Sequence, residues 1–202
     1  LSRNAFGTIS DAAATFFPRD QPTSRTAAGF PKDAFVVGVI AANKGVPSRK
    51  GFSQMLGAYK IFSERHPGES VLYIHTHVRQ PDGEDLMLMC ERLRIRLRIV
   101  HQYYYALGID ASSLADVMSS FDVFLNLAHG EGFGLPILDA MAMGIPVLTS
   151  DLGSMKEVSD DAAMLVDPRS VESIRAGLSE LIANKDLRET LRAKGLERAK
   201  DF

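Results

Sequence analysis

Three glycines surround one carboxylate in the stretch HGEGFGLPILDAMAMGIPV, residues 129–147. Gly130, Gly132 and Gly134 allow a ligand to approach the backbone closely, and Pro136 suits the first turn of a helix because its missing N–H would have no partner there. Free N–H groups at the start of a helix, together with the positive end of its dipole, attract anions. The loop therefore predicts a site for a phosphate group.

Glu131 lies between these glycines, where it would repel a phosphate alone. A carboxylate accepts hydrogen bonds and sugar hydroxyls donate them, so a ligand with a sugar and a phosphate would suit the whole loop. Asp139, two turns along the predicted helix, is a second carboxylate that could accept from hydroxyls. The alternative is that the glycines only build a tight turn and that both acids are surface residues near a helix start, where the dipole favours them.

A basic loop, NKGVPSRKG at residues 43–51, lies ahead of another predicted helix. Lys44, Arg49 and Lys50 would lie beside free helix N–H groups, and each charge-assisted hydrogen bond to a diphosphate would contribute about 1.5–3 kcal/mol. The spacing Gly-x-x-x-x-Gly-Lys-Ser/Thr is absent, which disfavours a P-loop with Mg²⁺-ATP chemistry. The alternative is that these are solvated loop charges.

Short apolar runs alternate with amphipathic segments from Asp33 onward, which is typical of βα units on a parallel sheet. The predicted strands are residues 34–42, 70–76, 97–101, 122–127, 145–150 and 163–167. Apolar residues at steps of three and four predict helices from about Gly51, over 86–93, over 114–118, after Gly134, over 171–181 and from Leu187. We therefore expect an α/β fold, a doubly wound sheet of about six parallel strands with helices on both faces. Ligands bind such sheets at the carboxyl ends of the strands, which is where both loops fall.

The first part of the chain, residues 1–32, is rich in Ser, Thr, Ala and Pro and shows no sustained period. It predicts a connecting arm that Phe16 and Phe17 would hold against the domain of residues 33–202. A chain of 202 residues can bury a substantial core in one domain. The start at Leu1 and the end directly after a helical pattern predict a piece of a longer protein.

Composition excludes several function classes. A net charge of −2 gives no basic surface of the kind that nucleic acid needs, so no nucleic-acid partner is expected. The single cysteine, Cys90, fits a reducing compartment. No apolar run is long enough to cross a bilayer and the first residues lack a signal pattern, which predicts a cytoplasmic protein.

The segment EGFGLPILDAMAMGIPV, with RKGF after the first strand, DVFLNL before it and GSMKEV after it, resembles the donor-binding half of the retaining GT-B glycosyltransferases of group 1. The resemblance extends from about Phe35 to the C-terminus. It implies a Rossmann-like domain, one half of a GT-B fold, that uses a UDP- or GDP-linked sugar as donor and keeps the anomeric configuration. It implies no metal or other cofactor. The N-terminal acceptor domain, absent from this chain, would be the partner, and only that half would associate with a membrane.

The resemblance also implies roles for individual residues. Glu131 would contact hydroxyls of the donor sugar, while Lys50 and Arg49 would stabilise the charge that develops on the diphosphate. The second acidic position, usually Glu and a ligand of the ribose, falls on Asp139, which is one carbon–carbon bond, about 1.5 Å, shorter. The arginine of the family lies earlier, where this chain has NKG, so either Lys44 or Arg49 substitutes for it or the contact is lost. The expected donor-binding residues are Asn43, Lys44, Lys50, Tyr103, Gly132, Phe133, Gly134, Leu135 and Asp139.

Three features admit other interpretations. A Tyr103 ring could stack on the base or pack against a neighbouring loop. The HTH segment, residues 75–77, lacks a third metal ligand, and RLRIRLR, residues 92–98, is most simply surface charge near a helix end. The competing function is a nucleotide-sugar-binding or regulatory module, or an epimerase-type half-domain, without transferase activity.

Overall fold

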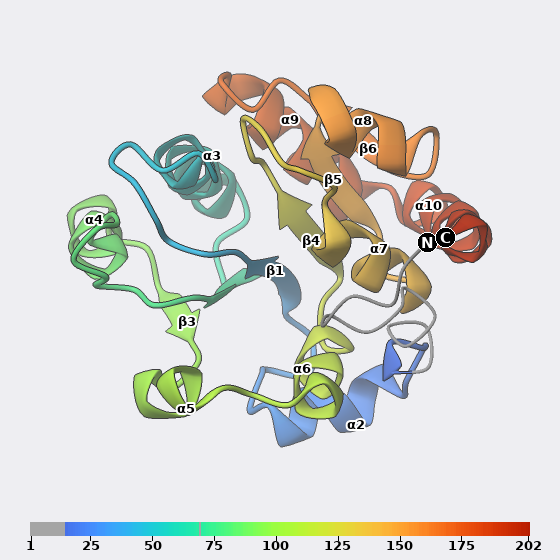
Figure 1. Ribbon diagram of the computed structural model, residues 1–202, viewed down its shortest axis with the longest axis horizontal. Helices are drawn as coiled ribbons and strands as arrows, with labels where there is room; N and C mark the ends of the chain where they lie inside the picture. Colours follow the sequence, from blue (N-terminus) through green and yellow to red (C-terminus); the bar gives the residue numbers. More distant parts are fainter. Residues whose placement is uncertain (1–14, 69) are drawn as a thin grey trace.

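A sheet of parallel strands forms the centre of the molecule. The computed structural model describes residues 15–68 and 70–202, apart from the side chains of Tyr103 and Tyr104. Within these residues six strands run in the order β3-β2-β1-β4-β5-β6, and every neighbouring pair is parallel (Figure 1). The strands are β1 (Phe35–Ile40), β2 (Ser70–His75), β3 (Leu97–Ile99), β4 (Val123–Asn126), β5 (Val147–Ser150) and β6 (Met164–Val166). The predicted six-stranded doubly wound sheet is confirmed, and its order reverses between β1 and β4.

Helices cover both faces of this sheet (Figure 1). In the described part of the chain they are α2 (Gln21–Ala27), α3 (Phe52–Arg65), α4 (Leu86–Leu93), α5 (Gln102–Leu107), α6 (Ala111–Met118), α7 (Leu135–Ala142), α8 (Gly153–Ser159), α9 (Val171–Ala183) and α10 (Lys185–Arg198). Side chains of α3, α4 and α9 pack with one face of the sheet, and those of α6, α7 and α8 pack with the other. No helix in the described residues is both long and apolar enough to span a bilayer.

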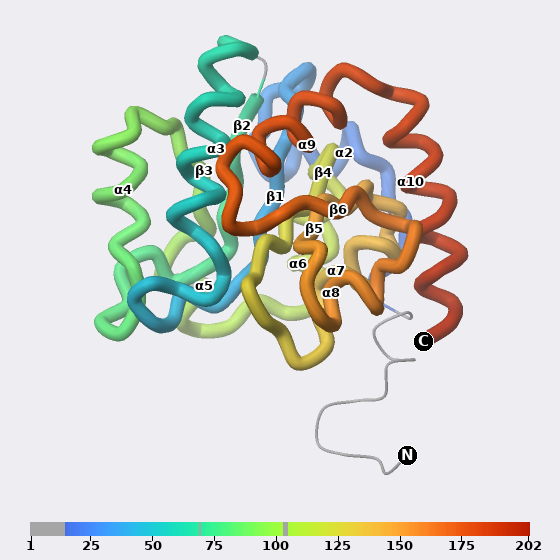
Figure 2. The backbone as a smooth tube through the Cα atoms, turned by 90° about the horizontal axis from the view of Figure 1, so that it is seen from above, coloured from blue at the N-terminus to red at the C-terminus, as the bar shows by residue number. Residues whose placement is uncertain are grey.

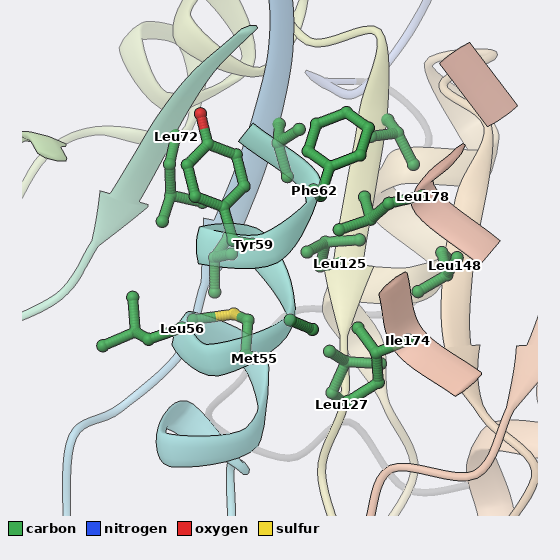
Figure 3. Packing of buried hydrophobic residues seen from close by; sticks show 14 of the residues in the cluster. Met55, Leu56, Tyr59, Phe62, Leu72, Leu125, Leu127, Leu148, Ile174 and Leu178 are labelled. Atoms are coloured by element: carbon green, nitrogen blue, oxygen red, sulfur yellow. The ribbon is translucent and has the colours of Figure 1, made fainter. Parts of the chain in front are cut away.

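Helix α3 buries the face that its sequence predicts. Met55, Leu56, Tyr59 and Phe62 recur at steps of three and four, and all four are buried. Figure 3 shows them beside apolar side chains of the central strands and of α9. The strands β1 and β4 are almost entirely apolar because helices cover both of their faces. This packing fixes α3, and with it the loop that precedes α3.

The segment predicted as an arm contains a helix that its pattern did not reveal. The carboxylate of Asp20 caps α2 by accepting from the Thr23 amide at 3.0 Å. Phe16 is buried, as expected, but Phe17 is about half exposed, at 49%, so the prediction that it pins the segment is wrong. Arg25 of α2 forms an ion pair with Asp122 beside β4. Helices α5 and α8 were likewise not predicted.

We expect Gly38→Ala to destabilise the sheet. A Cβ at this position of β1 would lie 2.1 Å from the buried ring of Phe121. Such overpacking should lower the free energy of unfolding by about 1–3 kcal/mol, measured by urea denaturation. The matched control is Gly57→Ala within α3, where the nearest atom outside the helix, on Val171, would be 3.6 Å away. This control should gain about 0.5–1 kcal/mol from helix propensity, and an equal loss in both variants would contradict the packing argument.

Candidate functional site

Two loops meet at the carboxyl edge of the sheet, where the strand order reverses. One connects β1 to α3 and the other connects β4 to α7; both lie at the lower side of Figure 2. The His129 amide donates to the carbonyl of Arg49 at 2.7 Å. Gly51 has φ of 68°, and a Cβ there would lie 2.6 Å from the carbonyl oxygen of Leu127, so only glycine fits this contact. The loops therefore hold each other in place at the position where ligands bind in open α/β sheets.

An ion-pair cluster lies between these loops. The Glu131 carboxylate pairs with Lys50 Nζ and, at 3.2 Å, with Arg49 Nη1. Arg49 Nη1 also donates to the carbonyl of Gly130 at 2.8 Å. The side chains of Lys50 and Glu131 are each 11% exposed, whereas that of Arg49 is 61% exposed. The structure thus brings together the three residues predicted as catalytic, although sequence analysis did not anticipate that they pair with one another.

The rest of the glycine-rich loop leads into α7. Gly134 precedes the helix with φ of 95°, a conformation that suits glycine, and within the described residues no side chain caps the first amides of α7. Phe133 and Leu135 are exposed, and Gly132 is also exposed. The Ser154 hydroxyl donates to the carbonyl of Glu131 at 2.9 Å, which ties the loop to α8. The arrangement leaves a helix N-terminus open to an anion next to the ion-pair cluster.

Asp139 lies one turn into α7 and is partly buried. Burial raises the pKa of its carboxyl group to about 6. Among the described residues the structure shows no hydrogen bond to this carboxylate. Contact between Asp139 and a ribose stays a prediction.

We expect the raised pKa of Asp139 to make stability depend on pH. Because the folded protein holds this proton more tightly than the unfolded chain does, stability falls as pH rises between about 4 and 6 and stays lower above that range. Asp139→Asn removes the charge, so it should stabilise the protein above pH 6 and leave it nearly unchanged below pH 4. Urea denaturation at a series of pH values measures this difference. A constant difference at every pH would contradict it.

Asn43 holds two loops together. It is fully buried, and its Nδ2 donates to the carbonyls of His77 at 3.0 Å and Glu84 at 2.7 Å. Its Oδ1 accepts from the Glu84 amide at 3.0 Å. These bonds occupy the side-chain amide, so Asn43 positions the loop, and its predicted contact with a donor stays a prediction.

Lys44 and Tyr103 are the remaining residues that were predicted to bind the donor. Lys44 is exposed in the β1–α3 loop and forms no ion pair within the described residues. Tyr103 belongs to α5, and its side chain lies outside the described part of the structure. Their predicted contacts with a ligand therefore stay predictions.

Several polar residues of this edge were not predicted to matter. His129 Nε2 is buried without a hydrogen-bond partner in the described structure, beside the loop contact at Gly51. The hydroxyl of Tyr73 bonds with His75 Nδ1 at 3.1 Å, and burial lowers the pKa of His75. No group of three potential metal ligands occurs among the residues that the structure describes. The Tyr73–His75 contact joins two residues of β2, whereas the approach of His129 to Gly51 joins two different loops and has no local pattern in the sequence.

The sequence matches a family model described as "Glycosyl transferases group 1" over residues 20–198. Among curated proteins, it is 44% identical over 72 residues to the O-antigen chain mannosyltransferase B of Escherichia coli, covering 36% of this chain and 19% of that protein. It is 30% identical over 154 residues to the phosphatidyl-myo-inositol mannosyltransferase of Mycobacterium tuberculosis, covering 73% and 38%. The chain thus spans less than half the length of these relatives.

Solved structures show the same fold. The C-terminal domain of a glycosyl transferase group 1 family protein from Francisella tularensis superposes with a TM-score of 0.78 at 20% identity, covering 94% of this chain and 96% of that one. The glycosyltransferase WaaG, described as involved in lipopolysaccharide biosynthesis, gives a TM-score of 0.75 at 19% identity, covering 92% and 48%. In the second case this chain corresponds to about half of the other protein.

Proposed function

Because this chain belongs to the group 1 glycosyl transferases, we propose that residues 33–202 are the donor-binding half of a retaining enzyme. The donor would be a nucleotide diphosphate sugar. The observation that supports this most strongly is the cluster of Glu131 with Lys50 and Arg49, next to the uncapped N-terminus of α7. A carboxylate, two cations and free amides offer acceptors for sugar hydroxyls and donors for a diphosphate in one place.

The ion pairs suggest how the donor is accommodated. In the free chain the single Glu131 carboxylate pairs with both Lys50 and Arg49, so each of these three charges lies beside an opposite charge. A diphosphate would take over the two cations, and the sugar hydroxyls would donate to the released carboxylate. Lys50, Arg49 and Glu131 would therefore each have a new hydrogen-bonding partner in the complex with the donor. A phosphate without a sugar would displace Glu131 and offer it nothing in return.

The same groups would assist bond breaking. When the bond between the anomeric carbon and the diphosphate breaks, negative charge grows on the leaving diphosphate. Lys50, Arg49 and the first amides of α7 would lie where this charge develops, which is how preorganised donors lower a reaction barrier. The acceptor and further catalytic groups would come from an N-terminal acceptor domain. By itself this chain should therefore bind donor without transferring sugar.

The sugar and the nucleotide can be tested together. The names of the relatives make mannose the first sugar to examine. Calorimetric titration of this chain with UDP, GDP and ADP, and then with GDP-mannose and UDP-glucose, would identify the donor. We expect one nucleoside diphosphate to bind, and its sugar conjugate to bind at least as tightly. Absence of binding by all five compounds at millimolar concentration would contradict the proposal.

A further inference from the structure

A cavity lies at the opposite edge of the sheet from the candidate site. Its volume is about 540 Å³, and three arginines line it, Arg94, Arg96 and Arg98. It lies where β2 and β3 begin, whereas the loops of the candidate site follow the ends of strands. Figure 2 shows these two edges at the upper and lower sides of the molecule. The cavity is therefore separate from the proposed donor site.

The chain path explains why the three arginines converge. Helix α4 ends at Leu93, its C-cap Arg94 is left-handed with φ of 55°, and the next residue, Ile95, is buried. Leu97 and Ile99 of β3 pack against the core cluster below α3. Arg98 alternates with these two residues along β3, and Arg96 directly precedes the strand, so both lie at the start of β3 where the cavity opens. The guanidinium of Arg98 lies 5.8 Å from the centre of the Phe30 ring, which limits its movement.

No acidic residue in the described structure balances these charges. Arg94, Arg96 and Arg98 form no ion pair with a described residue, whereas Arg25, Arg175 and Arg198 all do; Glu69, next to this cavity in sequence, lies outside the described residues. Tyr59, Ser63 and Ser70 also line the cavity. The hydroxyls of Tyr59 and Ser70 bond to each other at 3.1 Å, and that of Ser63 donates to the carbonyl of Lys60 at 3.0 Å. The net charge of the chain is −2, so this local excess of positive charge is not a consequence of a basic composition.

We propose that this cavity binds a phosphate or diphosphate group carried by a larger molecule. Guanidinium groups form paired hydrogen bonds with phosphate oxygens, and the bonded hydroxyls of Tyr59 and Ser70 keep one proton between them to donate to a further oxygen. A volume of about 540 Å³ lies within the range of about 300–1,000 Å³ typical of small-molecule sites, so it has room for more than a free phosphate ion. The proposal does not depend on the proposed function, because no residue of the candidate site contributes to this cavity.

Pyrophosphate is the probe for a first test. We expect ¹H–¹⁵N NMR titration of the 202-residue chain to shift the amides of residues 70–71 and 94–98, separately from any shift at residues 130–135. The triple variant R94Q/R96Q/R98Q should bind at this site at least about tenfold more weakly. The matched control is Arg92→Gln, an exposed arginine of α4 that does not line the cavity, which should change affinity by less than about twofold. Thermal unfolding of each variant verifies that it is folded.

A second experiment distinguishes a lipid headgroup from a soluble phosphate compound as the ligand. Co-sedimentation with vesicles of phosphatidylglycerol, compared with phosphatidylcholine, tests a lipid headgroup. Binding to phosphatidylglycerol that the triple variant loses, and that Arg92→Gln keeps, would assign the site to a headgroup; binding to pyrophosphate alone would assign it to a soluble phosphate compound. Both results support the proposal. Equal weakening in the triple variant and in Arg92→Gln, or no binding of either probe at residues 94–98, would overturn it.

Discussion

Lys50→Ala should lower the rate of sugar transfer by the complete enzyme at least about 100-fold. Lys50 is the nearly buried cation of the candidate site, so it acts on a leaving diphosphate with little screening by water. Arg49, 61% exposed, cannot replace it fully. In this chain the same substitution should abolish calorimetric binding of the nucleoside diphosphate. Turnover and titration are therefore two independent measurements of one effect.

The control for this variant is Lys60→Ala, a lysine of α3 that pairs with Glu64 on the surface. Its removal should change turnover by less than about twofold, because an exposed helix ion pair contributes little. Loss of Lys50 also leaves Glu131 with fewer partners, so unfolding must be measured beside activity. Lys50→Arg, which keeps the charge, should recover part of the binding. Near-normal turnover of folded Lys50→Ala would contradict the assignment of the site.

The fold was predictable where packing repeats along the chain. The apolar runs of the six strands and the regular apolar face of α3 are properties of contiguous segments, and the structure confirms them. Helix α2 has only seven residues and lies in a segment without a period. Its cap at Asp20 is visible in the sequence, but its ion pair from Arg25 to Asp122 joins residues 97 positions apart. No short stretch of sequence indicates a contact between residues that lie so far apart along the chain.

The site was predictable in its location and less so in its contacts. Strand order places the loops of Lys50 and Glu131 at one edge, and this follows from a doubly wound sheet. Their ion pair spans 81 positions and depends on how closely the two loops approach. The side-chain partners of Asn43 were missed for a related reason: a polar residue at a strand end resembles a ligand contact, while these partners belong to another loop. The arginines of residues 94–98 likewise form a cavity only once α4 and β3 are packed.

Glu131→Gln should separate recognition of the sugar from recognition of the diphosphate. The substitution keeps the shape of the side chain and removes the charge that pairs with Lys50 and Arg49 in the free chain. With these cations available, the affinity for a nucleoside diphosphate should rise by up to about tenfold, since the diphosphate no longer has to displace a carboxylate. Transfer by the complete enzyme should nevertheless fall at least about 100-fold, because a neutral amide accepts less strongly from the sugar hydroxyls in the transition state.

Calorimetry with the preferred nucleoside diphosphate and its sugar conjugate measures this separation. In the wild type the sugar should add affinity; in Glu131→Gln it should add little. The control is Glu172→Gln, a surface carboxylate paired with Arg175 on α9, which should leave both affinities unchanged.

Comparison of the two site variants is decisive, because it distinguishes a binding role for Glu131 from a structural one. If the ion pair served only to hold the loops together, Lys50→Ala and Glu131→Gln would break the same contact and weaken the nucleoside diphosphate alike. If Glu131 occupies the cations until the donor arrives, the two variants should move this affinity in opposite directions. Weaker binding of the nucleoside diphosphate by both variants would contradict the proposal that Glu131 binds the sugar hydroxyls. It would not affect the fold or the family assignment.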